Sequence, residues 1–259
     1  MELTTVFQNY AKSFLCGRAD FDGNIELKRT HSFRVMSLAA KIARAEKADE
    51  NDFRLAVTAG LLHDYGRFEQ YRQFETFADA RSIDHGELGA RLLKEHNVLH
   101  DFSSRDAEWI ITAVRCHNMR ELPAELSGKA LWLTQIVRDA DKIDIIELVL
   151  SYYASNLDNP QVTLGLSPEK RLSPAIVSAA IQGKAPDYRD LRTFYDFAVT
   201  KLSWFAGLYF DWSRREFLRR AYPERIIGFI AGIPGAEEIT AAFAGMVKNA
   251  GLQWNSTKM

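Results

Sequence analysis

The feature that most constrains this chain is an apolar stretch, residues 53–62, that runs directly into His63 and Asp64. Its apolar positions recur at helical spacing, and Asp64 falls on the same face as Val57 and Leu61. A carboxylate on a buried face needs a partner or a metal, because an unpaired buried charge is very costly. The stretch therefore predicts a core helix that ends in a histidine and an acid, although one such pair can also be purely structural.

Two further histidines lie on apolar helical faces. His31 stands on the apolar stripe of a helix expected over about residues 26–46, so we expect its side chain to face the core. His117 stands on the apolar face of a helix expected over about residues 105–118. Each histidine has two interpretations, a satisfied core residue or a ligand.

A fourth histidine, His85, follows a connection of about twenty residues that begins after Asp64 and is partly helical. Long irregular connections in compact domains tend to be functional. Asp84 and Glu87 have the spacing of a capping box, which predicts that a helix starts here. His85 would then lie in the first helical turn, at the mouth of any pocket.

Two acids lie on a largely apolar stripe of a helix expected over about residues 131–151, namely Asp141 and Asp144. One interpretation is a pair of buried acids neutralised by Arg138 or Lys142. The other makes Asp141 a metal ligand and Asp144 a pocket residue or a support for a ligand.

Taken in order, these positions resemble the pattern of the HD-domain superfamily, with a His, a His-Asp pair, two further His and an Asp on successive helices. The pattern is closest to the branch that supplies six ligands to two metals, and it covers about residues 25–150. The resemblance implies an all-α fold, an HD-domain helical bundle. It also separates these residues from His100-Asp101, a His-Asp pair with no apolar run before it.

The resemblance assigns four ligands to the first metal: His31, His63, Asp64 and Asp141. Asp64, the residue expected to be essential for catalysis, would bridge to a second metal that His85 and His117 also bind. Imidazole and carboxylate ligands suit borderline divalent metals. Two divalent ions are therefore expected, Fe or Mn, with Zn, Ni, Co or Mg as alternatives.

Several charged residues interleaved with the motifs are predicted to contact a substrate: Arg34, Arg67, Arg81, Arg138, Lys142 and Asp144. A cationic side chain at the rim of a metal site can neutralise phosphate charge. Arg34 can equally be a surface charge, and Arg67 and Arg81 can be solvated charges of the connection.

Three functions are compatible with the pattern. The first is a metal-dependent phosphohydrolase that cleaves an ester or anhydride of a small phosphate compound or nucleotide, since the six-ligand order looks like that of bacterial HD hydrolases of dinucleoside polyphosphates. The second is a mixed-valence di-iron oxygenase of the same superfamily, which uses the same ligands. The third is a non-catalytic ligand-binding or signalling module. The interleaved basic residues favour hydrolysis, and the chain has Asp64-Tyr65-Gly66 in place of the Gly-Tyr-Pro signature of cyclic-dinucleotide phosphodiesterases.

Composition excludes other classes. The formal net charge of −1 gives no electrostatic footprint for nucleic acid or an acidic membrane. Two cysteines do not make a disulfide framework, and no apolar run is long enough to span a bilayer. A cytoplasmic protein with a small anionic substrate and no membrane partner is expected, and the oligomeric state stays open.

The domain organisation is expected to be an HD domain with an N-terminal helix, residues 1–152, and a C-terminal helical extension, residues 153–259, packed on it. A packing helix over residues 2–16 is followed by a turn-rich break around residues 17–24. In the extension, helices are expected at four places: about 172–182, 188–210, 212–220 and 235–250. Its crowded aromatic residues are interpreted as core packing, with base stacking as the alternative.

Overall fold

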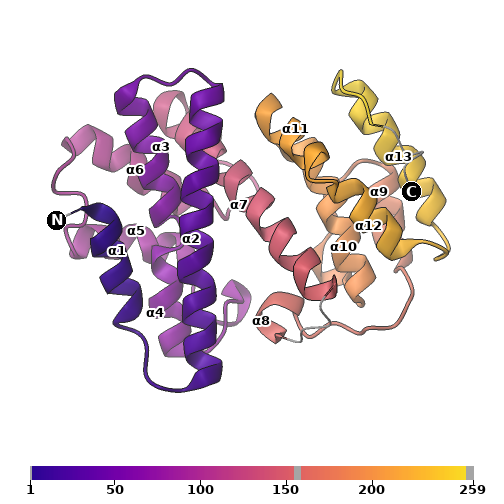
Figure 1. Ribbon diagram of the computed structural model, residues 1–259, viewed down its shortest axis with the longest axis horizontal. Coiled ribbons are helices and arrows are strands. Elements are labelled where there is room, and N and C mark those ends of the chain that lie inside the picture. The colour runs from indigo at the N-terminus through magenta and orange to yellow at the C-terminus, as the bar shows by residue number, and fades with distance from the viewer. Residues whose placement is uncertain (1, 155–158, 255–259) are drawn as a thin grey trace. The chain divides into compact units, whose positions relative to one another are not determined.

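The computed structural model confirms the all-helical fold (Figure 1). It describes residues 2–154 and 159–254, and within these ranges no residue lies in a β-strand. The chain divides into two compact units, which we call unit 1 (Met1–Asp144) and unit 2 (Ile145–Met259). The boundary falls inside a helix, eight residues before the predicted end of the HD domain at residue 152.

The elements of unit 1 are α1 (Leu3–Lys12), α2 (Ala19–Ala45), α3 (Glu50–Leu62), α4 (Tyr65–Phe74), the 3-10 turn η1 (Asp79–Arg81), α5 (His85–Glu95), α6 (Ser104–Cys116) and the first part of α7 (Gly128–Ala154). Those of unit 2 are the rest of α7, α8 (Pro160–Thr163), α9 (Pro174–Ile181), η2 (Tyr188–Asp190), α10 (Phe194–Ser203), η3 (Trp204–Gly207), α11 (Asp211–Arg219), α12 (Tyr222–Ile230) and α13 (Ala236–Asn249). Among the described helices, none combines the length and the apolar character that crossing a bilayer requires.

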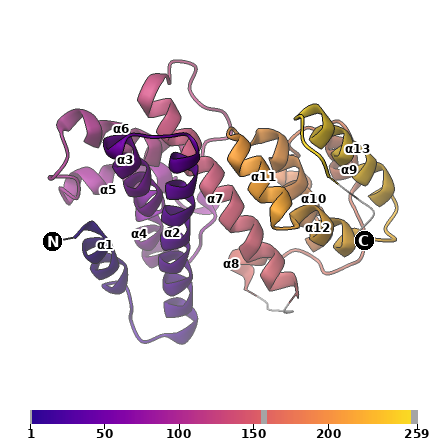
Figure 2. The ribbon, with the colours of Figure 1, turned by 45° about the horizontal axis from the view of Figure 1, so that its top comes forward.

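In unit 1, α2 and α3 lie side by side, as both Figure 1 and Figure 2 show. The N-terminal helix α1 packs through Phe7, which is fully buried. Its ring meets Phe33 of α2 and Phe68 of α4 edge-on, with centroids 5.6 and 5.7 Å apart. Such aromatic contacts add to the free energy of burial, so α1 is a packing helix, as predicted, although it ends at Lys12.

The long helix α2 begins earlier than predicted. We expected a turn-rich break through residues 17–24, but the helix already starts at Ala19 and includes Gly23. The carboxylate of Asp22 accepts hydrogen bonds from the backbone N–H groups of Cys16 and Gly17, at 2.8 and 2.9 Å, which holds the preceding turn. Acidic residues near a helix N-terminus are favourable, so residues that suit a turn here start the helix instead.

The beginnings of α4 and α5 approach each other closely because both carry glycine. A Cβ atom added to Gly66 would clash with the carbonyl oxygen of His85 and lie 2.6 Å from the backbone nitrogen of Gly89. Gly66 follows Asp64 by two residues. The contact therefore holds the His63-Asp64 segment next to the first turn of α5, where His85 stands.

The start of α5 differs from the prediction in two respects. Asp84 is the N-cap and accepts a hydrogen bond from the N–H of Glu87, but the Glu87 carboxylate forms an ion pair with Arg115 at 3.1 Å. The reciprocal half of the predicted capping box is therefore missing. His85 is 3% exposed, so it is buried and does not stand at the mouth of a pocket.

In unit 2, neither the short helix α8 nor helix α12 was predicted, and the single helix expected over residues 188–210 is divided into η2, α10 and η3. Helices α9, α11 and α13 lie close to their expected places. Pro223 stands in the first turn of α12, where the missing N–H of proline costs no hydrogen bond. The face formed by Tyr222, Ile226 and Ile230 is buried. The helix forms because proline at its first turn is compatible with an apolar helical stripe that follows.

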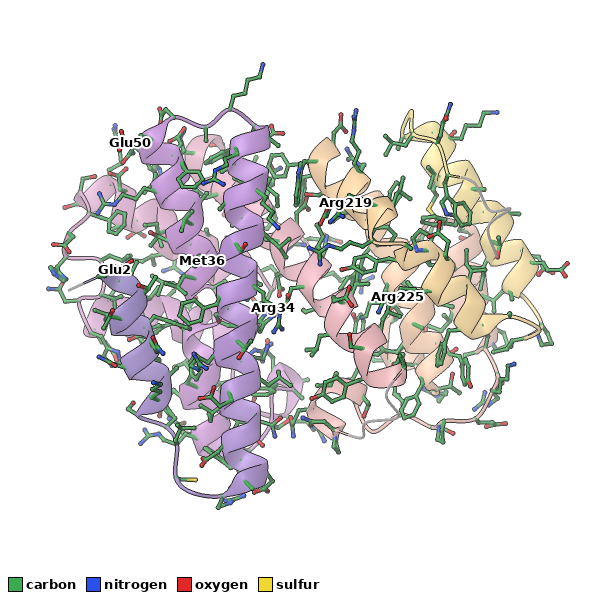
Figure 3. All side chains as sticks on the ribbon, viewed as in Figure 1. Glu2, Arg34, Met36, Glu50, Arg219 and Arg225 are labelled. Carbon is green, nitrogen blue, oxygen red and sulfur yellow. The ribbon has the colours of Figure 1, made fainter. Side chains whose placement is uncertain are left out.

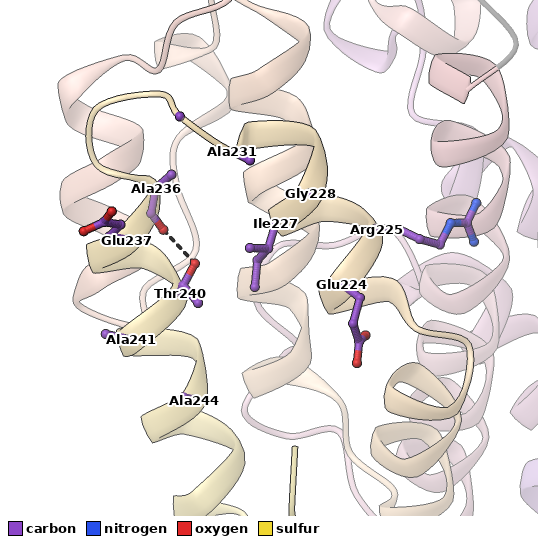
Figure 4. Close-up of a pocket in the computed structure, with 11 residues that line it drawn as sticks. Glu224, Arg225, Ile227, Gly228, Ala231, Ala236, Glu237, Thr240, Ala241 and Ala244 are labelled. Atoms are coloured by element: carbon purple, nitrogen blue, oxygen red, sulfur yellow. Dashed lines mark hydrogen bonds between the residues drawn. The ribbon is translucent and has the colours of Figure 1, made fainter. Parts of the chain in front are cut away.

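A cavity of about 850 Å³ lies between α12 and α13 (Figure 4). Small residues such as Gly228, Ala241 and Ala244 line it, with Glu224 at its edge. None of the six predicted metal ligands lines this cavity.

Candidate metal centre

The first half of the candidate centre lies where α2, the end of α3 and α7 meet. His31 projects from α2 and His63 is the C-cap of α3, and both imidazoles are buried. Their Nε2 atoms are 3.1 Å apart. Asp141 of α7 places its Oδ1 atom 3.1 Å from His31 Nε2 and 3.6 Å from His63 Nε2. Three side chains from three helices thus direct their ligand atoms to one place.

The second half of the candidate centre is formed by His85 and His117. His85 is the first residue of α5, and His117 is the C-cap of α6. Both side chains are buried, and their Nε2 atoms are 3.0 Å apart. Two helix ends therefore bring a second pair of imidazoles together.

Asp64 lies between the two pairs. Its Oδ2 atom is 3.5 Å from His31 Nε2 and 3.6 Å from His63 Nε2. Its other oxygen, Oδ1, is 3.4 Å from His85 Nε2 and 3.8 Å from His117 Nε2. One buried carboxylate thus presents one oxygen to each pair, which is the arrangement that a bridging ligand needs.

The hydrogen bonds of His85 and His117 show that this second pair suits a cation. His85 Nδ1 lies 2.7 Å from the carboxylate of Asp79, and His117 Nδ1 lies 2.7 Å from the carbonyl oxygen of Val114. Both partners only accept hydrogen bonds, so both Nδ1 atoms carry the hydrogen in the neutral rings. The two Nε2 lone pairs then face each other at 3.0 Å, an unfavourable contact that a shared cation resolves.

The spacing of these atoms also fits a metal ion. Two ligand atoms about 2.1 Å from a metal and at right angles to one another lie about 3.0 Å apart. The Nε2 pairs have separations of 3.1 and 3.0 Å. Imidazole and carboxylate donors match borderline divalent metals. The residues present therefore fit a divalent metal ion in donor type and in spacing.

The carboxylates in the first half of the candidate centre favour a positive charge between His31, His63 and Asp141. Burial lowers the pKa of His31, but hydrogen bonds to Asp141 and Asp144 raise it more, and the net shift is upward. The pKa of Asp141 is well below its usual value because the imidazoles of His31 and His63 outweigh the effect of burial. A group of residues that stabilises an imidazolium in this way also stabilises a metal cation.

In the second half of the candidate centre, the surroundings of His85 and His117 favour the neutral form of both imidazoles. Burial, followed by the neighbouring rings of His85 and His63, lowers the pKa of His117 to about 3. Burial and Arg67 lower the pKa of His85, and the nearby carboxylates only partly offset this. Neutral imidazole is the form that binds metals, so at neutral pH these two side chains are ready to act as ligands.

Two cations that lie beside Asp64 shape its charge. Lys28, one turn before His31 on α2, places Nζ 2.7 Å from Asp64 Oδ2, and Arg67 Nε lies 3.4 Å from Asp64 Oδ1. Burial would raise the pKa of Asp64, but Lys28, His63 and Arg67 lower it well below its usual value. The sequence analysis did not single out Lys28. The only available signal was its spacing of three residues from His31.

Three of the residues predicted to contact a substrate also contact other residues of the protein, and their role toward a substrate stays a prediction. Arg34, labelled on α2 in Figure 3, donates two hydrogen bonds to Asp144 at 2.6 and 2.9 Å. The carboxylate of Asp144 also lies 2.7 Å from His31 Nδ1. Arg138 donates to the carbonyl oxygens of His117, at 3.0 Å, and Met119, beyond the end of α6.

The remaining predicted contacts differ in their surroundings. Arg67 donates to Gln70 at 2.7 Å and to Asp79 at 2.9 Å, and to the carbonyl oxygen of Phe77. Arg81 is exposed in η1. Burial lowers the pKa of Lys142 to about 8. A substrate contact for any of these residues stays a prediction.

Asp79 is the second residue that sequence reasoning missed. It stands in η1, within the connection of about twenty residues after Asp64, and it accepts the hydrogen bond from His85 described above. Its carboxylate also accepts hydrogen bonds from Gln70 at 2.8 Å and from Asn118 at 3.2 Å. Nothing in the spacing of the motifs connects residue 79 to His85.

Fold and site together define a class of protein, an all-helical chain in which histidine and aspartate side chains come together in groups that could hold a divalent metal. Residues 29–146 match the family model described as the HD domain, and this range contains all six predicted metal ligands. The match supports a place for the chain in the HD superfamily. No curated protein and no solved structure matches the chain.

Proposed function

We propose that this protein is a metal-dependent phosphohydrolase of the six-ligand HD branch, which cleaves a phosphate ester or anhydride of a small molecule or nucleotide. One observation carries the proposal. The two oxygens of Asp64 face two separate pairs of imidazole nitrogens, at 3.4–3.8 Å. His31, His63 and Asp141 would hold one metal with Asp64, and His85 and His117 would hold the other.

The residues around this centre suit an anionic substrate. Two divalent ions supply Lewis acidity and a nucleophilic water at neutral pH. Four neutral imidazoles and two carboxylates leave such a pair of ions with net positive charge. Lys28 adds a cation beside Asp64, with its side chain 14% exposed. A phosphoryl group entering this site would meet positive charge from the protein as well as from the ions.

The test combines metal analysis with a screen for released phosphate. Protein purified with and without oxygen is analysed for metal per chain. It is then assayed with Mn²⁺, Fe²⁺, Co²⁺ or Zn²⁺ against nucleotides, dinucleoside polyphosphates and sugar phosphates. We expect about two metals per chain and metal-dependent release of phosphate or of a nucleoside phosphate. His100→Ala is the matched control, because His100 is exposed and remote in sequence from the six residues.

Three results would contradict the proposal. One is a single metal at saturation, with His85→Ala and His117→Ala both fully active, which would indicate a mononuclear phosphatase. Another is consumption of oxygen by the iron form with no hydrolysis of any phosphate, which would indicate the di-iron oxygenase. Ligand binding without turnover under any metal would indicate a signalling module.

A further inference from the structure

The four imidazoles of the centre are oriented in two different ways. His63 and His117, both helix C-caps, direct Nδ1 to the carbonyl oxygen three residues earlier on their own chain segment. The distances are 2.8 Å to Gly60 and 2.7 Å to Val114. The backbone of each helix end therefore fixes these two rings without any further side chain.

The other two imidazoles depend on carboxylates from elsewhere in the chain. His31 Nδ1 lies 2.7 Å from Asp144 Oδ2, and His85 Nδ1 lies 2.7 Å from Asp79 Oδ2. Neither histidine has a backbone carbonyl in this position among its hydrogen-bond partners. Each half of the centre thus contains one ring held by its own backbone and one ring held by an aspartate.

An arginine holds each of these aspartates. Arg34 contacts both oxygens of Asp144, at 2.6 and 2.9 Å, and Arg67 donates to Asp79 Oδ1 at 2.9 Å. The two oxygens of each aspartate are thus divided between an arginine and a histidine, or shared by both. A carboxylate with such partners accepts hydrogen bonds, so each aspartate accepts the Nδ1 hydrogen of its histidine.

We propose that Arg34 with Asp144 and Arg67 with Asp79 are two matched positioning pairs, one for each metal of the proposed centre. Each aspartate fixes its histidine with hydrogen on Nδ1, which leaves Nε2 as the ligand atom. Each arginine fixes the aspartate. The inference rests on the proposed metal centre, and it assigns Arg34 a structural duty in place of the substrate contact expected from the sequence.

Arg67 also lies beside Asp64, so the effects of an Arg67 variant could not be assigned to Asp79 alone. Its Nε atom lies 3.4 Å from Asp64 Oδ1, so removing its side chain disturbs both halves of the centre. Arg34 has no such contact with Asp64, and its side chain is 42% exposed. The informative variants are therefore the two aspartates, with Arg34→Gln as a milder change in the first half.

The experiment compares Asp144→Asn with Asp79→Asn in the full chain. Metal-free protein is titrated with Mn²⁺ and with Zn²⁺ in competition with a chelator. Loss of a residue that orients a metal-binding histidine costs about 10–100-fold in affinity. We expect Asp144→Asn to weaken one metal by that factor and Asp79→Asn to weaken the other, so each variant is the control for its counterpart. Asp101→Asn, at an exposed position, should change neither.

A second readout needs neither metal nor activity. Ring nitrogen NMR at pH 8 reports which nitrogen of each histidine carries the hydrogen. We expect His85 to lose its fixed Nδ1–H form in Asp79→Asn, whereas His117 keeps it in both variants. If Asp144→Asn does not fold, Arg34→Gln should weaken the same metal to a smaller extent.

Two results would overturn the inference. Both variants could bind two metals within two-fold of the wild-type affinities with unchanged ring signals, or each could weaken both metals equally. A failure of the proposed function is distinguishable from these results. Wild-type protein that binds two metals but hydrolyses no phosphate would refute the phosphohydrolase and leave the positioning pairs intact.

Discussion

At the scale of single residues, the proposed centre is expected to depend most on Asp64, whose two oxygens face the two histidine pairs. Asp64→Asn keeps the shape and removes the charge, whereas Asp64→Ala removes both oxygens. We expect both variants to weaken both metals and to lose at least about 100-fold in phosphohydrolase activity, because a bridging ligand serves each ion. Metal analysis beside a steady-state assay measures both effects.

The control for this prediction addresses Lys28, whose side chain is only 14% exposed and pairs with Asp64. Removing one partner of a buried ion pair leaves the other charge uncompensated and is strongly destabilising. Lys28→Met in combination with Asp64→Asn should therefore recover melting temperature but not metal binding. Wild-type turnover with full metal occupancy in Asp64→Asn or in Asp64→Ala would refute the bridging role of Asp64.

The burial of individual residues in the candidate centre could be predicted from the sequence better than their hydrogen-bond and ion-pair partners. The periodicity of the expected helices placed His31 and Asp64 on buried faces. The structure buries both, although α3 ends at Leu62 and Asp64 is the N-cap of α4. Lys28 and Asp79 were missed because their roles depend on where a flexible side chain or an irregular turn points. Arg34 was expected to contact a substrate, since the spacing of residues along one helix does not show that Asp144, 110 residues later, lies beside it.

At the scale of elements, the candidate centre is built largely from the termini of helices. His63 and His117 are both C-caps, and His85 begins a helix, so three of the four imidazoles stand at helix termini. Helix boundaries are the least predictable part of a sequence-based assignment, as the early start of α2 shows. The close approach of Gly66 in α4 to the first turns of α5 brings two of these termini together, the segment of His63 and Asp64 and the start of α5 at His85.

Helix α11 provides a test of element stability away from the centre. Its Glu216, 6% exposed, pairs with Arg219 at 2.6 Å and with Arg220 at 2.7 Å. Hydrogen bonds from Arg219 and then Arg220 lower the pKa of Glu216 to about 2, despite some burial. The carboxylate therefore contributes stability above the unfolded-state pKa near 4.5, and this contribution is lost as the pH falls from 4.5 towards 2.

We expect Glu216→Gln to lower the free energy of unfolding at pH 7 by about 1 kcal/mol, since the arginine partners are partly exposed and screened by solvent. The difference from wild type should narrow as the pH is lowered below 4.5. Urea denaturation of both proteins at pH 7, 4.5 and 3.5 measures it. A difference that stays constant or widens in acid would show that the ionised carboxylate is not the source.

At the scale of the whole molecule, all six proposed ligands belong to unit 1. An ion that binds only the folded state stabilises it by mass action, by about 2.7 kcal/mol at a hundred times the dissociation constant. We expect Mn²⁺ to slow amide hydrogen exchange in α2, α3, α5 and α6, and to leave α9 and α13 unchanged. Exchange mass spectrometry with and without Mn²⁺ measures this, and Asp64→Ala is the control that should show no response.

An equal slowing of amide exchange in both units would contradict that expectation and would mean that the two units unfold as one cooperative block.

The all-α class could be predicted from hydrophobic periodicity together with the order of the motifs in residues 25–150. The layout of unit 2 could not be predicted as well. Pro223 stands in the first turn of helix α12, and in a sequence a proline marks a break or a first turn equally well.

The run of α7 across the unit boundary sets a limit on how the chain can be shortened. The HD-domain match ends at residue 146, and unit 1 ends at Asp144, but the helix continues to Ala154. A chain cut at either place would leave Asp141 and Asp144 near a helix terminus, where the last four carbonyl groups have no partner in the helix and the end frays. The rigidity of the last proposed ligand is thus supplied by residues that lie beyond the domain it serves.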